Sequence, residues 1–151
     1  FPSVPIAVFR PDIKLTLLDS LNKRTIFLEK LCEKLGVKAE IIHGRAEEVS
    51  KNEKYREQFD VACARAVANM AVLSEFCLPF VKVGGNFSAL KGPNESIEAS
   101  EKAVKILGGK LASQIDYDLF DEQRKIVVAE KISQTATKYP RNSGKIKKNP
   151  L

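Results

Sequence analysis

Several residue types and patterns that mark common protein classes are scarce in this chain of 151 residues, which has no tryptophan, one histidine and three cysteines. It has no run of about 18 apolar residues, which argues against a membrane-spanning helix. Residues 4–9 are too short, and lack the flanks, for a signal peptide. The cysteines, Cys32, Cys63 and Cys77, are odd in number, widely spaced and without a C-x-x-C pair. They therefore indicate buried free thiols in a reducing cytoplasm.

Motifs for metal binding and nucleophilic catalysis are missing as well. The lone histidine, His43, has no paired ligands in the sequence, so it argues against a metal site and more simply caps a strand or lines a pocket. The chain contains neither G-x-x-x-x-G-K-[ST] nor G-x-S-x-G. It also lacks the Asp-Pro-Pro-Tyr type of sequence that serves methylation of exocyclic amines, and the Pro-Cys that attacks pyrimidine rings.

Acidic residues are absent from the last positions, Lys131–Leu151, which carry six lysines or arginines. The preceding positions hold 19 basic and 19 acidic side chains, so the net charge of +6 belongs to this terminal segment. A neutral body with a basic terminus predicts contact with a polyanion, and a merely solubilising terminus is the alternative. We expect residues 1–133 to form one domain and residues 134–151 to form a basic tail.

Apolar, β-branched runs alternate with helical periodicity along the chain. After a short opening helix, strands are expected over residues 13–19, 39–44, 59–64, 87–91, 110–119 and 125–132. Longer helices are expected over residues 21–35, 67–83 and 95–107, each followed by glycine. This alternation predicts an α/β fold, with a parallel sheet and helices on both faces.

The last two expected strands are joined by the acidic turn Phe120–Gln123 with no helix between them, so they should pair antiparallel. A closing antiparallel hairpin on a mostly parallel sheet is typical of the Rossmann-like class I methyltransferase fold. Dehydrogenases usually keep a parallel edge there. The ending of the chain therefore favours the methyltransferase variant.

Ligands of open parallel sheets bind beyond the carboxyl ends of the strands. Asp19 and Ser20 follow the first expected strand, where a carboxylate can accept both hydroxyls of a ribose. A helix cap is the alternative, since both residue types cap helices well. Arg45–Glu48 follows the second strand, where backbone amides and a carboxylate can read the edge of an adenine. Its alternative is a solvated helix start with acids favoured by the helix dipole.

Basic side chains end the next two expected strands. Arg65 closes an otherwise apolar strand, and a guanidinium there needs an anionic or stacked partner, although a structural pair with a local acid is the alternative. Lys91 lies beside Gly92, where its amino group can approach a phosphate. Lys23 and Arg24 add charge to the same rim. These lysines and Arg24 could equally be solvated surface charges.

Six segments of the chain resemble one known family in their residue strings, namely residues 1–5, 17–24, 45–48, 64–66, 89–92 and 138–141. The family is the bacterial small-subunit ribosomal RNA guanine-N7 methyltransferases, formerly called glucose-inhibited division protein B. The Leu-Asp-Ser-x-x-Lys-Arg and Lys-Tyr-Pro-Arg strings are the most specific. The resemblance implies a cytoplasmic monomer that methylates N7 of a guanine in 16S ribosomal RNA, free or in the small subunit, with S-adenosylmethionine as donor.

The resemblance also implies roles for individual residues. The cofactor pocket maps to Phe1, Asp19, Ser20, Ala46, Glu47 and Arg65, with Asp19 placed for the ribose. Arg65 is in addition the candidate for orienting the guanine. From their positive charge rather than from the resemblance, we expect RNA contacts at Lys23, Arg24, Lys91, Lys138, Arg141, Lys145, Lys147 and Lys148. Because N7 of guanine carries a lone pair and no proton, the reaction needs no general base, in agreement with the missing acid–base constellation.

The family has a Gly-rich loop and a first strand before its Phe-Pro, whereas this sequence opens at Phe1. We therefore expect a sheet without its central strand, a hydrophobic cleft in its place, and poor folding of residues 1–151 alone. Two other functions remain open. A nucleotide-dependent oxidoreductase would share Asp19 but leaves the basic tail unexplained. A non-catalytic RNA-binding module would explain the tail but leaves Asp19, Glu47 and Arg65 without a role.

Overall fold

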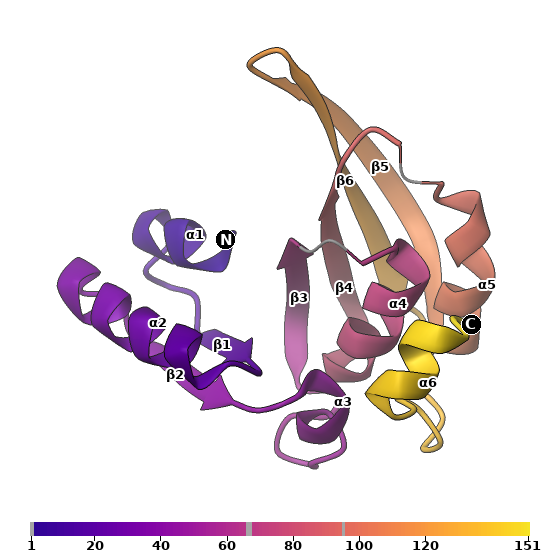
Figure 1. Cartoon of the computed structure of the whole chain (residues 1–151), viewed down its shortest axis with the longest axis horizontal. Coiled ribbons are helices and arrows are strands. Elements are labelled where there is room, and N and C mark those ends of the chain that lie inside the picture. The colour runs from indigo at the N-terminus through magenta and orange to yellow at the C-terminus, as the bar shows by residue number, and fades with distance from the viewer. Residues whose placement is uncertain (1, 66–67, 95) are drawn as a thin grey trace.

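The computed structural model describes residues 2–65, 68–94 and 96–151. Its helices are α1 (Ser3–Phe9), α2 (Asn22–Leu35), α3 (Ala46–Val49), α4 (Met70–Cys77), the 3₁₀ turn η1 (Leu78–Phe80), α5 (Glu98–Ile106) and α6 (Ser143–Lys148). Its strands are β1 (Leu15–Asp19), β2 (Ala39–His43), β3 (Phe59–Arg65), β4 (Val81–Lys91), β5 (Gly109–Leu119) and β6 (Glu122–Lys131). In Figure 1, α4, α5 and α6 lie together along β4 to β6, and α1 and α2 accompany β1 and β2.

The strands form two sheets. In the first, β1 and β2 run parallel, with residue pairs from Leu15↔Ala39 to Asp19↔His43. The second has the order β3-β4-β6-β5, in which β3 and β4 are parallel and β6 is antiparallel to both of its neighbours. The antiparallel closing hairpin expected from the sequence is therefore confirmed.

The expected parallel sheet is divided, because within the described ranges no ladder joins the β1–β2 pair to the four-stranded sheet. In Figure 1 the pair lies on the β3 side of the larger sheet. Every residue of β1 is half-buried, although its apolar sequence predicts a fully buried strand. In β3, Val61 is 56% exposed. The partial exposure of β1 and of Val61 has one cause. Because the sheet is divided, the described strands β1 and β3 each pair with a neighbour on one edge only.

Local sequence signals set the helix boundaries. At the end of α2, Gly36 adopts φ +64°, a conformation that glycine tolerates better than other residues. Asn69 begins α4 by accepting a hydrogen bond from the Val72 amide at 2.9 Å. Asn142 begins α6 in the same way, accepting from the Lys145 amide at 2.9 Å.

The helix expected over residues 67–83 is wrong in its extent, and Val67 itself lies outside the described residues. The observed helix α4 ends at Cys77 and gives way to η1, and β4 already starts at Val81. Pro79 explains the difference, because proline has no amide hydrogen and its ring clashes with a continuing helix.

Strand β4 is consequently longer than the expected 87–91 and passes through Gly84 and Gly85. A Cβ atom at Gly85 would lie 2.5 Å from the Asp60 carbonyl oxygen, so glycine is required where β3 and β4 approach each other. The acidic turn is tighter than expected. It contracts to Phe120 and Asp121, because β6 begins at Glu122.

The core lies between α4, α5 and the four-stranded sheet, with Met70, Leu78, Phe87, Val104, Leu107 and Val127 at its centre. Tyr139 and Leu151 pack against this core, and Ile146 of α6 is fully buried. Full burial of such an apolar side chain contributes about 1.5–3 kcal/mol. The segment expected as a basic tail, residues 134–151, is therefore anchored on the body.

Candidate functional site

The carboxyl ends of β1 and β2 bring together residues that are far apart in the sequence. Asp19 and His43 pair in the strand register, and the Gly44 amide donates to the Asp19 carbonyl oxygen at 3.0 Å. His43 Nε2 lies 3.2 Å from the Ser20 carbonyl oxygen. Asp19, Ser20 and His43 thus form one edge, where ligands of parallel sheets bind.

The Asp19 carboxylate has two different oxygens. Oδ1 accepts a hydrogen bond from the Leu21 amide at 2.8 Å, which makes an Asx turn at the entry to α2. Oδ2 lies 3.5 Å from Nη1 of Arg24, and the side chain is 21% exposed. Oδ1 therefore stabilises the turn, and Oδ2 lies on the side of Arg24, where it can accept a hydrogen bond from a ligand hydroxyl.

Helix α3 begins directly after the end of β2. The amides of Ala46 and Glu47 belong to its first turn and have no intrahelical acceptor, as in any helix. The Glu47 side chain is only 9% exposed, and its Oε1 lies 3.6 Å from Nη1 of Arg45. The segment predicted from the sequence thus presents amide donors and a sheltered carboxylate close to the Asp19–His43 pair.

Arg65 is the exposed last residue of β3, on the four-stranded sheet. The start of helix α1 lies beside this strand, because Ser3 Oγ and Cys63 Sγ lie 3.2 Å apart. The two groups come from the start of α1 and the end of β3, whose proximity is visible in Figure 1. Phe1, the other expected pocket residue on this side, lies outside the described residues.

Lys91 points inward. Its side chain is 6% exposed, and its amino group donates to the Ala68 carbonyl oxygen. The end of β4 is thereby tied to the segment that precedes α4. This burial favours a structural role for Lys91 over the predicted contact with RNA.

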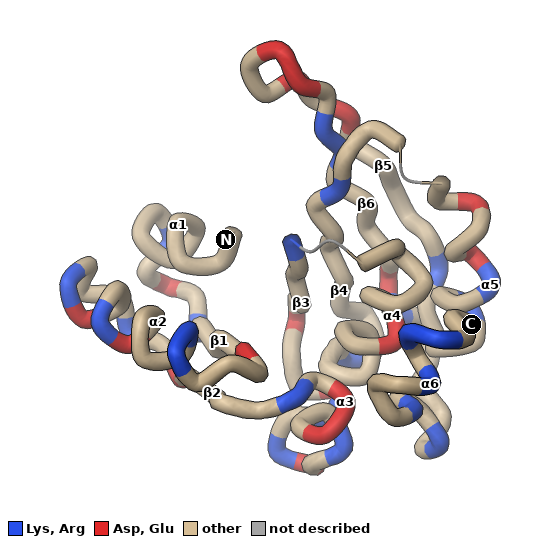
Figure 2. Tube along the Cα trace, in the orientation of Figure 1, with Lys and Arg blue, Asp and Glu red and all other residues tan. Residues whose placement is uncertain are grey.

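The remaining predicted RNA contacts fall on two edges of the fold. Lys23 and Arg24 are exposed in the first turn of α2, beside Asp19. Lys138 and the three lysines of α6 are exposed on the C-terminal segment, and Figure 2 marks where α6 carries basic residues. Because β6 runs antiparallel to β4, its end at Lys131 lies beside the start of β4, opposite Arg65.

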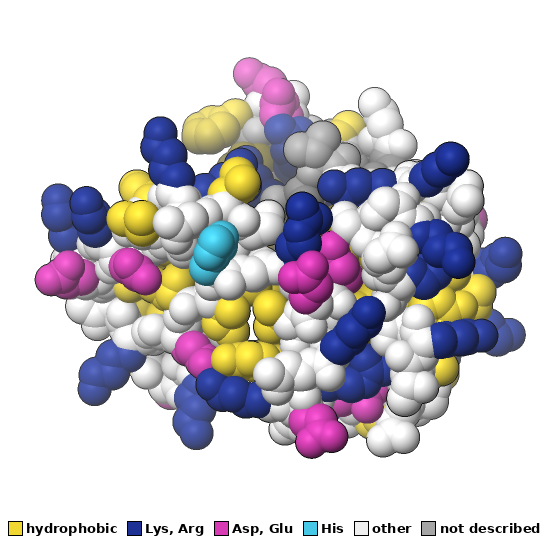
Figure 3. Space-filling model, turned by 60° about the horizontal axis from the view of Figure 1, so that its bottom comes forward, with side chains coloured by type: hydrophobic (Ala, Val, Ile, Leu, Met, Phe, Trp, Pro, Cys, Tyr) yellow, Lys and Arg dark blue, Asp and Glu magenta, His cyan; other side chains and the backbone are white. Residues whose placement is uncertain are grey.

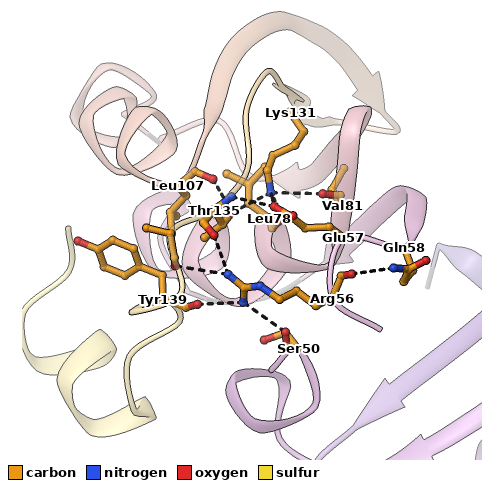
Figure 4. Close-up of polar contacts among 11 residues, drawn as sticks. Ser50, Arg56, Glu57, Gln58, Leu78, Val81, Leu107, Lys131, Thr135 and Tyr139 are labelled. Carbon is orange, nitrogen blue, oxygen red and sulfur yellow. Dashed lines mark hydrogen bonds and ion pairs between the residues drawn. The ribbon is translucent and has the colours of Figure 1, made fainter. Parts of the chain in front are cut away.

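A buried polar network fixes the start of the C-terminal segment (Figure 4). Lys131 is fully buried, and its amino group donates to the carbonyl oxygens of Leu78 and Val81 at 2.8 and 3.2 Å and to Thr135 Oγ1 at 2.7 Å. Glu57 Oε1 lies 3.1 Å from the same amino group. Burial lowers the pKa of Lys131, and the hydrogen bond that its amino group donates to Glu57 opposes this shift.

Arg56 completes the network from the neighbouring position. Its guanidinium donates to the carbonyl oxygens of Tyr139 at 3.0 Å and Thr135 at 2.7 Å, and also to that of Ala136. The loop before β3 is thereby joined to the C-terminal segment. The sequence did not reveal these roles, because Lys131 was counted with the tail charges and neither Arg56 nor Glu57 belongs to a recognisable motif.

Arg141, another predicted RNA contact, is committed to Glu75 of α4. Its Nε donates to Glu75 Oε1 at 2.8 Å and its Nη2 to Oε2 at 2.6 Å. The Glu75 side chain is fully buried. One signal could have revealed this pair, since Glu75 is the single charged residue in the otherwise apolar segment of α4.

Comparison with known proteins identifies the family. The family model of the rRNA small subunit methyltransferase G, GidB, matches residues 1–127. The chain belongs to this family. It is 48% identical to the ribosomal RNA small subunit methyltransferase G of Lactobacillus acidophilus, aligned over all of this chain and 65% of that relative. The relative from Clostridium novyi is 49% identical, with 64% of its length covered. The chain thus spans about 65% of the length of these curated relatives.

Solved structures with low sequence identity confirm the Rossmann-like class I methyltransferase fold. A 16S rRNA (adenine(1408)-N(1))-methyltransferase mutant from Catenulisporales acidiphilia superposes with a TM-score of 0.70 at 11% identity, covering 89% of this chain and 81% of that one. An rRNA methylase from Streptococcus thermophilus has a TM-score of 0.55 at 19% identity, covering 80% and 74%. The family assignment and the observed strand order therefore both indicate a class I methyltransferase fold.

Two classes of site find no support in the residues that the structure describes. They include no group of three or more His, Cys, Asp or Glu residues able to hold a metal ion. No described helix has the length and apolar character required to cross a bilayer. The candidate site is the edge formed by Asp19, Ser20, His43, Ala46 and Glu47, and Arg65 lies apart from it at the end of β3, on the other sheet.

Proposed function

We propose that the protein transfers a methyl group from S-adenosylmethionine to N7 of a guanine in 16S ribosomal RNA of the small subunit. One observation carries the proposal. The segments that match the GidB family place Asp19, Ser20, Ala46 and Glu47 together at the carboxyl edge of β1 and β2. The three cysteines are free thiols, which supports a reducing, cytoplasmic location. We further propose that it acts as a monomer.

The residues of this edge fit the cofactor. The rim-facing Oδ2 of Asp19 is suited to ribose hydroxyls, because its other oxygen is held by the Leu21 amide and fixes the carboxylate. The first amides of α3, at Ala46 and Glu47, can donate to acceptors on the adenine ring. A positively charged sulfonium makes the methyl group of S-adenosylmethionine reactive toward nucleophiles. Phe1 belongs to the same proposal by family resemblance alone.

In the proposed reaction the protein mainly positions the guanine. N7 has a free lone pair and carries no proton, so the site needs no side chain to remove one. Arg65, exposed at the end of β3, is placed to orient the guanine or an adjacent phosphate. Holding two reactants in near-attack geometry can supply about 7–11 kcal/mol of the barrier. The target base has to leave its stack to enter the site.

The RNA backbone is proposed to contact both edges of the fold. Lys23 and Arg24 lie beside the proposed cofactor edge, whereas Lys138 and the lysines of α6 lie on the C-terminal segment, which Arg56 joins to the end of α3. In this arrangement residues 1–133 carry the methyl-transfer site and residues 134–151 anchor RNA. Figure 3 shows basic side chains spread over one face of the molecule, which suits a phosphate backbone better than a single anion.

Methyl transfer from labelled S-adenosylmethionine to small-subunit RNA that lacks the modification tests the proposal. We expect label at a guanine N7. Asp19→Asn should weaken cofactor binding by about 10- to 150-fold, since hydrogen bonds to a charged group contribute about 1.5–3 kcal/mol. Asp12→Asn is the matched control, because this exposed carboxylate pairs with Arg10 away from the site. Cofactor binding without transfer would instead support a non-catalytic RNA-binding module.

A further inference from the structure

The β5–β6 hairpin extends beyond the sheet that supports it. Strand β4 pairs with β6 from Asn86↔Glu130 to Lys91↔Lys125, whereas the pairing of β5 with β6 continues to Leu119↔Glu122. The last pairs before the turn therefore have no third strand beside them. Figure 1 shows the hairpin standing clear of the rest of the molecule.

The tip of this hairpin presents apolar side chains to solvent. Phe120 is 95% exposed, and Leu119 and Ile115 are 50% and 53% exposed. Phe120 also adopts φ +55°, an uncommon backbone conformation for a bulky residue. Both its exposure and its backbone conformation are unfavourable in the isolated protein. Such a feature marks a surface that becomes buried against a partner.

The charge of the tip indicates the chemistry of that partner. Residues 116–123 contain four carboxylates, at Asp116, Asp118, Asp121 and Glu122, and no basic residue. Figure 2 shows this acidic tip on a chain whose net charge is +6. Among the described residues, Glu122 pairs with Arg124, and Asp116 accepts hydrogen bonds from the Gln114 side chain. Phosphates would be repelled here, whereas a cationic segment would be attracted.

A groove at the base of the tip places this surface next to the proposed substrate. The groove has a volume of about 370 Å³ and is lined by Pro93, Asp116, Tyr117, Asp118, Gln123, Arg124 and Lys125. Pro93 follows the carboxyl end of β4, and Arg65 ends the neighbouring parallel strand β3. A partner on the tip would therefore stand on the side of the fold where methyl transfer is proposed.

We propose that the β5–β6 tip docks on a lysine- or arginine-rich protein segment with an exposed apolar side chain, located beside the target guanine in a ribonucleoprotein particle. This inference rests on the proposed function and deepens it, because it makes RNA with bound protein the preferred substrate. Phe120 is the apolar anchor, and the carboxylates on either side of it select a cationic partner.

Two substrates test the inference, namely small ribosomal subunits that lack the N7 methyl group and the protein-free 16S RNA extracted from them. Phe120→Gly should lower kcat/KM about tenfold on the particles and leave it unchanged on the free RNA, since truncated aromatic anchors commonly cost a factor of this size. Glycine accepts a positive φ, so the same variant should unfold at an unchanged or higher urea concentration. Loss of activity would then have a cause other than misfolding.

Charge reversal provides the second arm. Asp121→Lys should lower kcat/KM on particles, whereas Glu29→Lys, an exposed site of α2, makes the same charge change away from the tip and should not. Equal activity of the tip variants and the unchanged protein on particles would overturn the inference. An equal loss on free RNA would also overturn it, because the tip would then contact RNA. Failure of the unchanged protein to methylate either substrate would instead overturn the proposed function.

Discussion

Glu75 and Arg141 lie 66 positions apart in the sequence and form a two-pronged ion pair, with Arg141 Nη2 2.6 Å from Glu75 Oε2. The Arg141 amide also donates to Glu75 Oε1 at 2.8 Å. Glu75 is fully buried in α4. One buried carboxylate thus holds both the backbone and the side chain of the C-terminal segment on the body, and the hydrogen bond that Arg141 donates to Glu75 raises the pKa of Arg141.

Arg141→Met should destabilise the protein by about 3 kcal/mol, because it leaves the Glu75 carboxylate buried without its cationic partner. Urea unfolding followed by circular dichroism measures the change. Lys145→Met is the matched control, since it removes an exposed positive charge from α6. Equal unfolding midpoints for the two variants would show that the pair does not anchor the segment.

The burial of Lys131 predicts an unusual dependence of the free energy of unfolding on pH. Burial lowers its pKa in the folded protein below the ordinary value of 10.5, which it regains on unfolding. Between these two pKa values the unfolded chain binds more protons, so the contribution of Lys131 to the free energy of unfolding rises with pH. Below the lowered pKa that contribution is constant.

The measurement is urea unfolding of the unchanged protein and of Lys131→Met from about pH 8 to about pH 11. The difference in free energy of unfolding, unchanged minus variant, should increase toward alkaline pH. Because methionine does not titrate, other groups largely cancel in this difference. A decrease would mean that the interaction with Glu57 outweighs burial and raises the folded pKa.

The cysteines should differ in reactivity. Burial raises the pKa of Cys77 to about 12, and it also raises the pKa of Cys32. Because the thiolate is the reacting form, both should modify slowly in the folded protein near neutral pH. Cys63 and Cys77 are both half-buried, so the raised pKa of Cys77 is the reason why Cys63 should react first with a chromogenic disulfide, and all three should react in urea. Persistence of the fast phase in Cys63→Ser would contradict this order.

Local patterns predicted much of the fold and the positions of the residues at the candidate edge. The strand–helix alternation and the strand-end rule placed Asp19 and Glu47 correctly at one edge, since both depend on residues close in sequence. The hairpin was also visible, as two strands without an intervening helix. The predicted extent of α4 is wrong because the apolar periodicity continues through Pro79, whereas the proline ends the helix in the structure.

Side-chain burial of charged residues could not be read from the same patterns. The sequence predicts surface positions for Lys91, Lys131 and Arg141. In the structure, each side chain has an internal partner contributed by a distant segment. Such partners depend on how β4, β6 and the C-terminal segment meet in space. Composition located the excess of basic residues but did not show which of them are committed to the fold.

This distinction changes how the RNA contact of the C-terminal segment should be tested. Deletion from Lys138 onward would remove Arg141 and the fully buried Ile146, so it would destabilise the fold together with any RNA contact. Substitution of the exposed lysines of α6 avoids this effect. The variant is Lys145→Ser, Lys147→Ser and Lys148→Ser, whose side chains all face solvent.

We expect this triple variant to bind small-subunit RNA more weakly and with a shallower dependence on salt. Each lost phosphate contact should reduce the slope of log affinity against log salt by about 0.7–0.9, so three should reduce it by about 2.

The matched control is Lys30→Ser, Lys34→Ser and Lys102→Ser, which removes the same charge from exposed positions of α2 and α5. Filter binding across a salt series measures both slopes, and affinity for S-adenosylmethionine should stay unchanged in both variants. Equal slopes for the two variants would show that net charge, rather than the position of α6 on the body, determines RNA binding.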